Sequence, residues 1–376
     1  MDSILEKKAS SNSKPTERFK SITVTSDLLK IDNRQADRLP NPQGINIDWL
    51  EVLVGRPISA ALGGIRTQKL YGDESNACIP RWTFYSQCGL PMDSASWAYV
   101  YEGRNVTDRI NEFLGQRFTR DELIICFEGP EYLINYFIEQ EIGYIDFTIH
   151  PVRFLPDYMF GVRTNVQHWH DKLAAAAIPD QIIMEFARIS TARTMRVYRK
   201  NVPLQGSALF LGQIEIDSSL IHCDKLATLD DVELALLSLS GKYPKIYYKS
   251  HPHLKEKKPV KAIVERISNC EWIDVNIYDA FACGAFDMIA TLSSGGAIEA
   301  RYFGCNSHWF LNRPDYTSST IQDSDKRYYA IYQSALEGSF WSYIFDDTRS
   351  IESYEPRWPA ASLDGFKFTL NQKWGR

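Results

Sequence analysis

The sequence between residues 208 and 311 alternates short apolar runs with longer amphipathic segments, and this alternation restricts the folds open to the chain. The apolar runs have the length of buried strands, and the segments between them have helical spacing. The pattern predicts five strands and four helices. The strands are at 208–214, 245–249, 271–275, 287–292 and 307–311, and the helices are at 229–242, 260–268, 277–283 and 295–303. We therefore expect a parallel, doubly wound α/β domain.

The first half of the sequence contains one clear β-α-β unit. It has predicted strands at 123–127 and 144–149 around a helix at 131–141, and two more helices follow at 169–177 and 180–198. A chain of 376 residues exceeds the usual size of one domain. We predict a polar lead-in (1–40), a first α/β domain (41–202), a second domain (203–349) that begins after a linker at 199–203, and a tail that packs back on the first domain (350–376).

Composition excludes several classes of protein. A formal charge of −5 argues against a nucleic-acid-coating protein. The seven cysteines form no C-x-x-C pair, so we expect neither a disulfide framework nor a zinc knuckle, and a cytoplasmic location. The sequence has no signal-peptide core and no apolar run of about 18 residues, so we expect at most peripheral membrane contact, made by basic N-terminal residues such as Lys7 and Lys8.

Polar residues follow the first predicted strand of the second domain. Ligands of doubly wound sheets bind outside the carboxyl ends of the strands, so these positions are candidates for a site. Gln213, Glu215 and Asp217 alternate along the segment 212–219, and at least one of the two carboxylates should face a cleft. Asp217 is equally suited to capping a helix, and the spacing does not decide between these interpretations.

Two further strand ends carry groups suited to an anion. Lys249 and His251 follow the second strand and could bind phosphate or carboxylate. His253 adds an imidazole, but no third ligand has recognisable spacing, so we expect no metal. Ser293 and Ser294 follow the fourth strand, with two glycines before a helix, a pattern typical of phosphate sites.

Glu299 lies about one turn into that last helix. Its carboxylate could accept hydrogen bonds from both hydroxyls of a ribose, or it could face solvent. Three strand ends of one sheet together predict a site for an anion that is linked to a nucleotide.

Three ordered motifs of the second half resemble a known family. They are G-Q-x-E-x-D-S-S at 212–219, Y-K-x-H-P at 248–252 and S-S-x-x-x-x-E-A at 293–300. They look like the motifs of the retaining β-Kdo glycosyltransferases of capsule and O-antigen synthesis. The resemblance implies a GT-B fold, with two Rossmann-like domains facing across a cleft. It also implies a CMP-β-Kdo donor, no cofactor or divalent metal, and activity on the cytoplasmic side of the inner membrane of a Gram-negative cell.

The resemblance also implies roles for individual residues. Asp217 matches the family's nucleophile, and a retaining double displacement needs such a carboxylate. Glu128, at a strand end of the first domain, resembles the second acidic residue and would act as base toward the acceptor hydroxyl. The resemblance also implies the donor-binding residues. Gln213 would orient the sugar or the Asp217 side chain. Lys249 and His251 would bind the phosphate or the Kdo carboxylate, Ser293 and Ser294 the phosphate, and Glu299 the ribose.

Some positions depart from the family pattern. Ser250 stands where the family usually has proline, and the glycines of the last motif come earlier, at Gly295 and Gly296. These departures leave the donor sugar open to another ulosonic acid or another nucleotide sugar. In the first half, where the resemblance is thinner, His150 and Arg153 are candidates for acceptor contacts, or else a buried histidine and a surface arginine.

The sequence therefore predicts a retaining glycosyltransferase. It would move Kdo or a related ulosonic acid from its CMP-sugar to a glycan or lipid-linked glycan acceptor. Two alternatives stay open. One is a UDP-sugar transferase or UDP-GlcNAc 2-epimerase-like enzyme of the same fold, and the other is a non-catalytic GT-B-like protein that binds a nucleotide or glycan.

Overall fold

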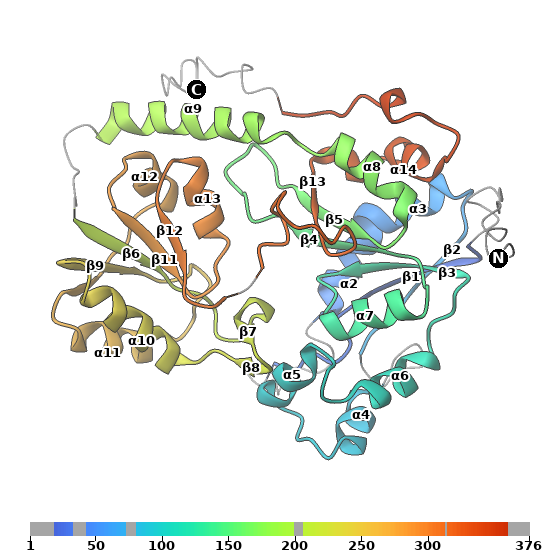
Figure 1. Cartoon of the computed structure of the whole chain (residues 1–376), viewed down its shortest axis with the longest axis horizontal. Helices are drawn as coiled ribbons and strands as arrows, with labels where there is room; N and C mark the ends of the chain where they lie inside the picture. The colour runs from blue at the N-terminus through green and yellow to red at the C-terminus, as the bar shows by residue number, and fades with distance from the viewer. Residues whose placement is uncertain (1–18, 33–42, 73–79, 199–205, 313, 360–376) are drawn as a thin grey trace, which may run out of the picture.

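The computed structural model of the protein describes residues 19–32, 43–72, 80–198, 206–312 and 314–359. Two sheets dominate these residues, and each lies between layers of helices (Figure 1). The predicted linker at 199–203, Lys7 and Lys8 lie outside the described residues, as does the tail beyond residue 359.

The second sheet has the order β10-β9-β6-β11-β12, and every pairing in it is parallel. Its strands are β6 (Ser207–Leu211), β9 (Lys245–Lys249), β10 (Cys270–Trp272), β11 (Met288–Thr291) and β12 (Ser307–Trp309). The connecting helices are α10 (Leu229–Ser240), α11 (Lys258–Arg266), α12 (Ile277–Ala282) and α13 (Gly296–Tyr302). The predicted alternation of five strands and four helices is thus confirmed.

Local sequence accounts for several of these element ends. The Thr228 side chain accepts from the backbone N–H of Asp231, and the Asp231 carboxylate accepts from the backbone N–H of Thr228. The two bonds form a capping box at the start of α10. Asn276 accepts backbone hydrogen bonds at the start of α12. A short 3-10 helix, η3 (Ser218–Leu220), and a hairpin of β7 (Ile221–His222) and β8 (Lys225–Leu226) follow β6.

The first sheet is mixed and has the order β13-β5-β4-β3-β1-β2. Its strands are β1 (Ser21–Ser26), β2 (Arg66–Lys69), β3 (Glu122–Phe127), β4 (Tyr144–Ile149), β5 (Phe160–Thr164) and β13 (Tyr329–Ile331). Alternate residues of β3 point into two separate cores. Leu123 and Ile125 pack in one core, and Ile124 and Cys126 pack in the other.

Helices cover both faces of this sheet. One core contains residues of α2 (Gly44–Leu50), the π-helical turn η2 (Glu51–Gly55), α3 (Arg56–Ala61), α8 (Gln167–Ala176), the 3-10 helix η4 (Gln333–Leu336) and α14 (Gly338–Phe345). The other contains residues of α4 (Arg81–Gln87), α5 (Ser94–Tyr101), α6 (Thr107–Gly115) and α7 (Glu131–Glu139). A last short helix, η5 (Ile351–Ser353), follows α14.

Two predicted domain boundaries are wrong, and a third falls beside a helix that contacts both domains. The lead-in 1–40 contains β1, an interior strand that pairs with β2 and β3, because its apolar residues fill the core of the first sheet. The predicted second domain extends too far, because β13 pairs with β5 and α14 packs on α3. Helix α9 (Asp180–Tyr198), predicted to belong to the first domain, contacts both: Ile183 packs with Val152 and Leu155 of the first domain, and the helix also packs against α12 and α13 of the second.

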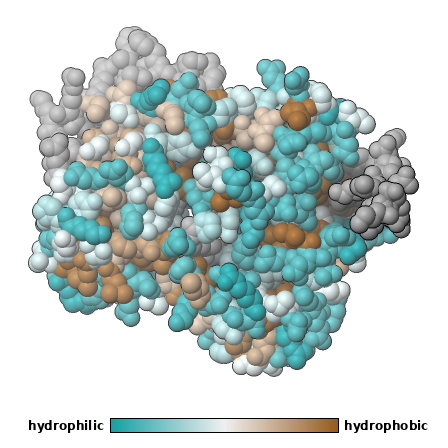
Figure 2. Space-filling view, viewed as in Figure 1, coloured by the Kyte–Doolittle hydropathy of each residue, from teal (hydrophilic) through white to brown (hydrophobic). Residues whose placement is uncertain are grey.

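Two α/β domains that face across a cleft, with a C-terminal return to the first, form the GT-B arrangement that the sequence predicts. The face of the molecule in Figure 2 is largely hydrophilic, and an apolar patch lies at its lower left, over the region of α10 and α11. Leu234 and Leu237 of α10 are among the exposed apolar residues. Among the described residues, no helix is both long enough and apolar enough to cross a membrane.

Candidate functional site

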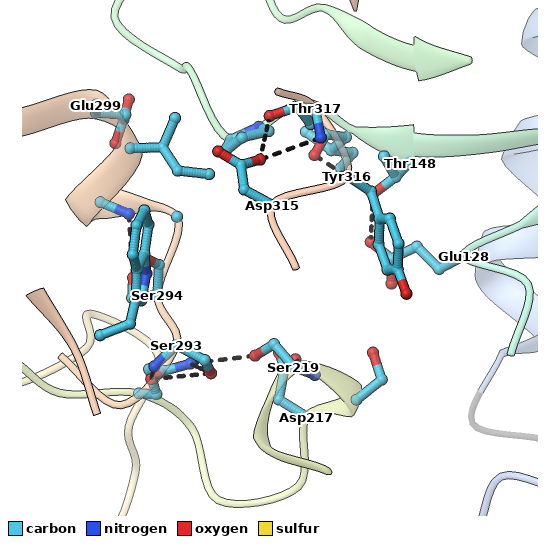
Figure 3. A pocket seen from close by; sticks show the side chains of 18 of the residues that line it. Glu128, Thr148, Asp217, Ser219, Ser293, Ser294, Glu299, Asp315, Tyr316 and Thr317 are labelled. Carbon is cyan, nitrogen blue, oxygen red and sulfur yellow. Dashed lines mark hydrogen bonds between the residues drawn. The ribbon is translucent and has the colours of Figure 1, made fainter. Parts of the chain in front are cut away.

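A cleft of about 490 Å³ lies between the two domains, within the range of roughly 300–1,000 Å³ typical of small-molecule sites. Residues after β3, β4, β6, β9 and β11 line it, as does the segment between β12 and β13. Figure 3 shows Glu128 and Thr148 on one side of the cavity, and Asp217, Ser293, Ser294 and Glu299 around the rest. The strand ends thus meet at one place, as predicted.

Gln213 connects two strand ends of the second domain. Its Nε2 donates to Ser219 Oγ at 3.1 Å and to Ser293 Oγ at 3.0 Å, and its Oε1 accepts from the Ser293 backbone N–H at 2.8 Å. It also accepts from the Thr291 hydroxyl at 3.2 Å. Gln213 therefore orients the loop after β11 against the loop after β6.

Asp217 lines the cleft, whereas Glu215 is exposed and does not. The backbone N–H of Ser219 donates to Asp217 Oδ1 at 2.8 Å, so the carboxylate also caps η3. Asp217 therefore both lines the cleft and caps a helix, so the two interpretations of this residue are compatible. The cap holds Oδ1.

Glu128 approaches the cleft from the first domain, directly after β3. Its φ of 49° lies in the left-handed region, which is uncommon for a residue with a side chain. The Thr148 hydroxyl donates to Glu128 Oε1 at 3.2 Å. Glu128 is exposed toward the cleft, and desolvation by the surrounding groups raises the pKa of its carboxyl to about 7, with the negative charge of Asp217 raising it further.

A buried ion pair beneath Glu128 holds this backbone turn. Arg163 Nε donates to Asp146 Oδ2 at 2.8 Å and Nη2 donates to the Gly129 carbonyl at 3.1 Å. Asp146 Oδ1 accepts from the Gly129 N–H at 2.9 Å, and the Tyr328 hydroxyl donates to Oδ2 at 2.6 Å. Both polar groups of Gly129 are therefore fixed, and with them the direction of the Glu128 side chain.

Glu299 is buried, with only 5% of its surface exposed, so the solvent-facing alternative is wrong. Its Oε1 accepts from the Arg153 backbone N–H at 2.7 Å and from the Tyr278 hydroxyl at 3.0 Å. Burial raises the pKa of Glu299 to about 7. Since Arg153 belongs to the first domain, Glu299 joins the two domains at one edge of the cleft.

The lysine and the histidine predicted to bind an anion after β9 do not lie together. His251 lines the cleft, and burial lowers the pKa of its imidazole, with the nearby charges of His253 and Arg153 adding to the effect. Lys249 does not line the cleft, and its Nζ lies 3.9 Å from Asp274 Oδ1. The structure therefore does not bring Lys249 together with the other predicted donor-binding residues.

Of the four remaining predicted residues, three line the cleft and one does not. Ser293 and Ser294 both line the cleft, and Ser294 Oγ accepts from the Gly296 N–H at 3.2 Å. Arg153 is exposed and lines the cleft. His150 is buried outside the lining, and its Nδ1 accepts from the Val152 N–H at 3.2 Å. Burial lowers the His150 pKa to about 4, so this residue is the neutral core histidine of the second interpretation.

Sequence reasoning missed several lining residues. Tyr278 follows the third strand of the second sheet, and reading that strand end like the others would have found it. Other polar and aromatic lining residues that the predicted motifs do not include are Tyr101, Glu131, Thr148, Arg163, Trp309, Asp315, Tyr316, Thr317 and Tyr328. Within the described ranges, no group of three or more His, Cys, Asp or Glu residues could hold a metal ion.

Comparisons with known proteins give distant structural likenesses only. No family model and no curated protein matches the chain. The β-Kdo 2,7 transferase of Thermosulfurimonas dismutans KpsC is similar at 13% identity, over 62% of this chain and 80% of that one, with a TM-score of 0.33. UDP-GlcNAc 2-epimerase from Neisseria meningitidis is similar at 12% identity, over 79% and 84%, with a TM-score of 0.27. These likenesses decide neither substrate nor mechanism, so we argue function from the cleft.

Proposed function

We propose that the protein is a retaining glycosyltransferase that moves Kdo or a related ulosonic acid from a CMP-sugar to a glycan acceptor. One observation carries the proposal. The carboxylates of Asp217 and Glu128 approach one cleft from opposite domains, near enough for the charge of Asp217 to raise the pKa of Glu128. The three motifs that resemble β-Kdo transferases supply the choice of donor.

The two carboxylates suit two successive displacements. Asp217 attacks the anomeric carbon of the donor, a carbon–oxygen bond forms, and CMP leaves with the electron pair of the broken bond. An acceptor hydroxyl then attacks the same carbon, the bond to Asp217 breaks, and Glu128 takes the proton of the hydroxyl. A base with a pKa near 7 is well matched to this step at neutral pH.

The other groups of the cleft suit the donor. His251 and Arg153 can bind its phosphate or carboxylate, and Ser293 and Ser294 can donate to phosphate oxygens. Gln213 holds Ser293 in place. Lys249 is no longer part of the proposed donor site, because it does not line the cleft.

The decisive experiment replaces Asp217 with asparagine. Asparagine caps a helix about as well as aspartate, so Asp217→Asn is expected to fold normally. It should reduce transfer by at least about a thousandfold, because the nucleophile is lost. Glu215→Gln, in the same segment but outside the cleft, is the matched control and should keep full activity. Substantial transfer by Asp217→Asn would contradict the covalent mechanism.

Intact mass spectrometry and thermal shift complete the test. Wild type incubated with CMP-Kdo without acceptor should gain the mass of one sugar, and Asp217→Asn should not. CMP should raise the melting temperature more than UDP does. Stabilisation by UDP and not by CMP would favour the UDP-sugar alternative.

A further inference from the structure

The first-domain side of the cleft carries a carboxylate that the proposed reaction does not use. Glu131, the first residue of α7, is half-buried and lines the cleft close to Glu128. Its side chain makes no hydrogen bond or ion pair with any other residue that the structure describes. A carboxylate in this state can accept hydrogen bonds from the hydroxyl groups of a ligand.

Arg163, on the same side of the cleft, has a donor without a partner. The residue is 2% exposed and lines the cleft. Its Nε and Nη2 are bound to Asp146 and Gly129, but its Nη1 is buried and has no acceptor among the described residues. Buried donors normally find a partner, so an oxygen atom of a ligand would complete this group.

The charges on this side of the cleft do not suit an anion. Glu128 and Glu131 are both acidic, and the charge of Arg163 is taken up by Asp146, 2.8 Å away. The groups suited to the anionic donor, the Arg153 guanidinium and the His251 imidazole, lie close together elsewhere in the cleft, since the charge of Arg153 lowers the pKa of His251. Lys30 does not line the cleft, although its charge lowers the Glu128 pKa. Among the residues that line this side, a carboxylate or phosphate on the acceptor would meet two carboxylates and an arginine that is already paired.

Resting on the proposed transferase function, we propose that Glu131 and Arg163 bind hydroxyl groups of an uncharged acceptor sugar next to Glu128. Glu131 accepts from one hydroxyl, and Arg163 Nη1 donates to an oxygen of the sugar. Acceptors that end in an acidic sugar are excluded by repulsion from Glu131.

Binding to the full-length protein in the presence of CMP tests this proposal without requiring turnover. The probes are methyl glycosides of a neutral hexose, of an N-acetylhexosamine and of a 3-deoxy ulosonic acid, with binding measured by saturation-transfer NMR. At least one neutral glycoside should bind, and the ulosonic acid should not. Glu131→Gln should weaken neutral binding about fivefold, because a charge-assisted hydrogen bond is lost, and should also reduce the discrimination against the acid.

Glu139→Gln, at the exposed end of the same helix, is the matched control and should bind like wild type. Binding of the ulosonic acid as tight as that of the neutral glycosides would overturn the proposal, as would unchanged affinity in Glu131→Gln. Release of CMP from CMP-Kdo is measured in parallel. Absence of release with every acceptor contradicts the transferase function, whereas the NMR result separately decides the nature of the acceptor.

Discussion

Glu128 combines a left-handed backbone with a carboxyl pKa of about 7. The ion pair of Asp146 and Arg163 keeps the turn in place, and the surrounding cleft disfavours the charged form of the carboxyl. Such strain persists only where the neighbouring structure enforces it, and it is concentrated at functional sites. Ionising the Glu128 carboxyl therefore costs free energy in the folded state, because the carboxylate is partly desolvated.

This cost predicts a pH dependence of stability. The pKa is higher in the folded chain than the ordinary 4.5, so the folded state binds more protons between about pH 4.5 and 7. The free energy of unfolding should fall as pH rises through this window and level off above it. Glu128→Gln should flatten part of this fall in urea titrations at pH 5, 6, 7 and 8. An unchanged pH profile in Glu128→Gln would show that Glu128 ionises normally.

For single residues, the sequence predicted which types of residue line the cleft better than it predicted the direction of each side chain. Asp217, Gln213, Ser293 and Ser294 meet in the cleft because the strand-end rule follows directly from parallel topology. His150 and Lys249 occupy equivalent positions in the sequence but point elsewhere. The direction of a side chain after a strand depends on local loop geometry, and no periodicity encodes it.

At the scale of elements, the turn between β11 and α13 meets the first domain. Gly295 has an ordinary φ of −58°, so its backbone does not require glycine. A Cβ at this position would lie 2.7 Å from the Cβ of Pro151, a first-domain residue that lines the cleft. Glycine is therefore needed for the close approach of the two domains, although the sequence alone had suggested a phosphate-binding turn.

Gly295→Ala is accordingly expected to loosen the approach of the domains without unfolding either one. The added methyl group displaces Pro151 and disturbs the nearby bond from Arg153 to Glu299, so we expect about a tenfold loss of CMP affinity by calorimetry. Gly241→Ala is the control, because a Cβ there makes only an ordinary contact at 3.9 Å. Equal CMP affinity in both variants would mean that Pro151 yields freely.

At the scale of the whole molecule, the chain enters the first sheet at β1 and returns to it at β13. The sequence predicted the second sheet almost completely, because its strands and helices alternate, with only η3 and the hairpin of β7 and β8 inserted after β6. It missed the contribution of residues 19–32 and 329–345 to the first domain. Both segments are short and gain their order from contacts distant in sequence, which local patterns do not report.

Trp341 of α14 shows how much the first domain depends on this return. Its side chain is fully buried against Phe147 and Phe345, and its Nε1 donates to the Ala335 carbonyl at 2.8 Å. Trp341→Ala should cost about 3–5 kcal/mol in urea unfolding, because it empties a site in the core. Trp82→Ala, at a side chain that is 51% exposed, should cost far less.

Hydrogen exchange locates the effect of Trp341→Ala. Backbone amides of β4 and β5 should lose protection, whereas those of β6 and β9 should keep theirs, because α14 packs on the first domain. If the helix instead belonged to the second domain, as its position in the sequence suggests, the loss would appear at β6 and β9. Because Phe147 lies between Asp146 and Thr148, loosened packing at Trp341 should also weaken the support of Glu128, and transfer should fall along with the protection of β4.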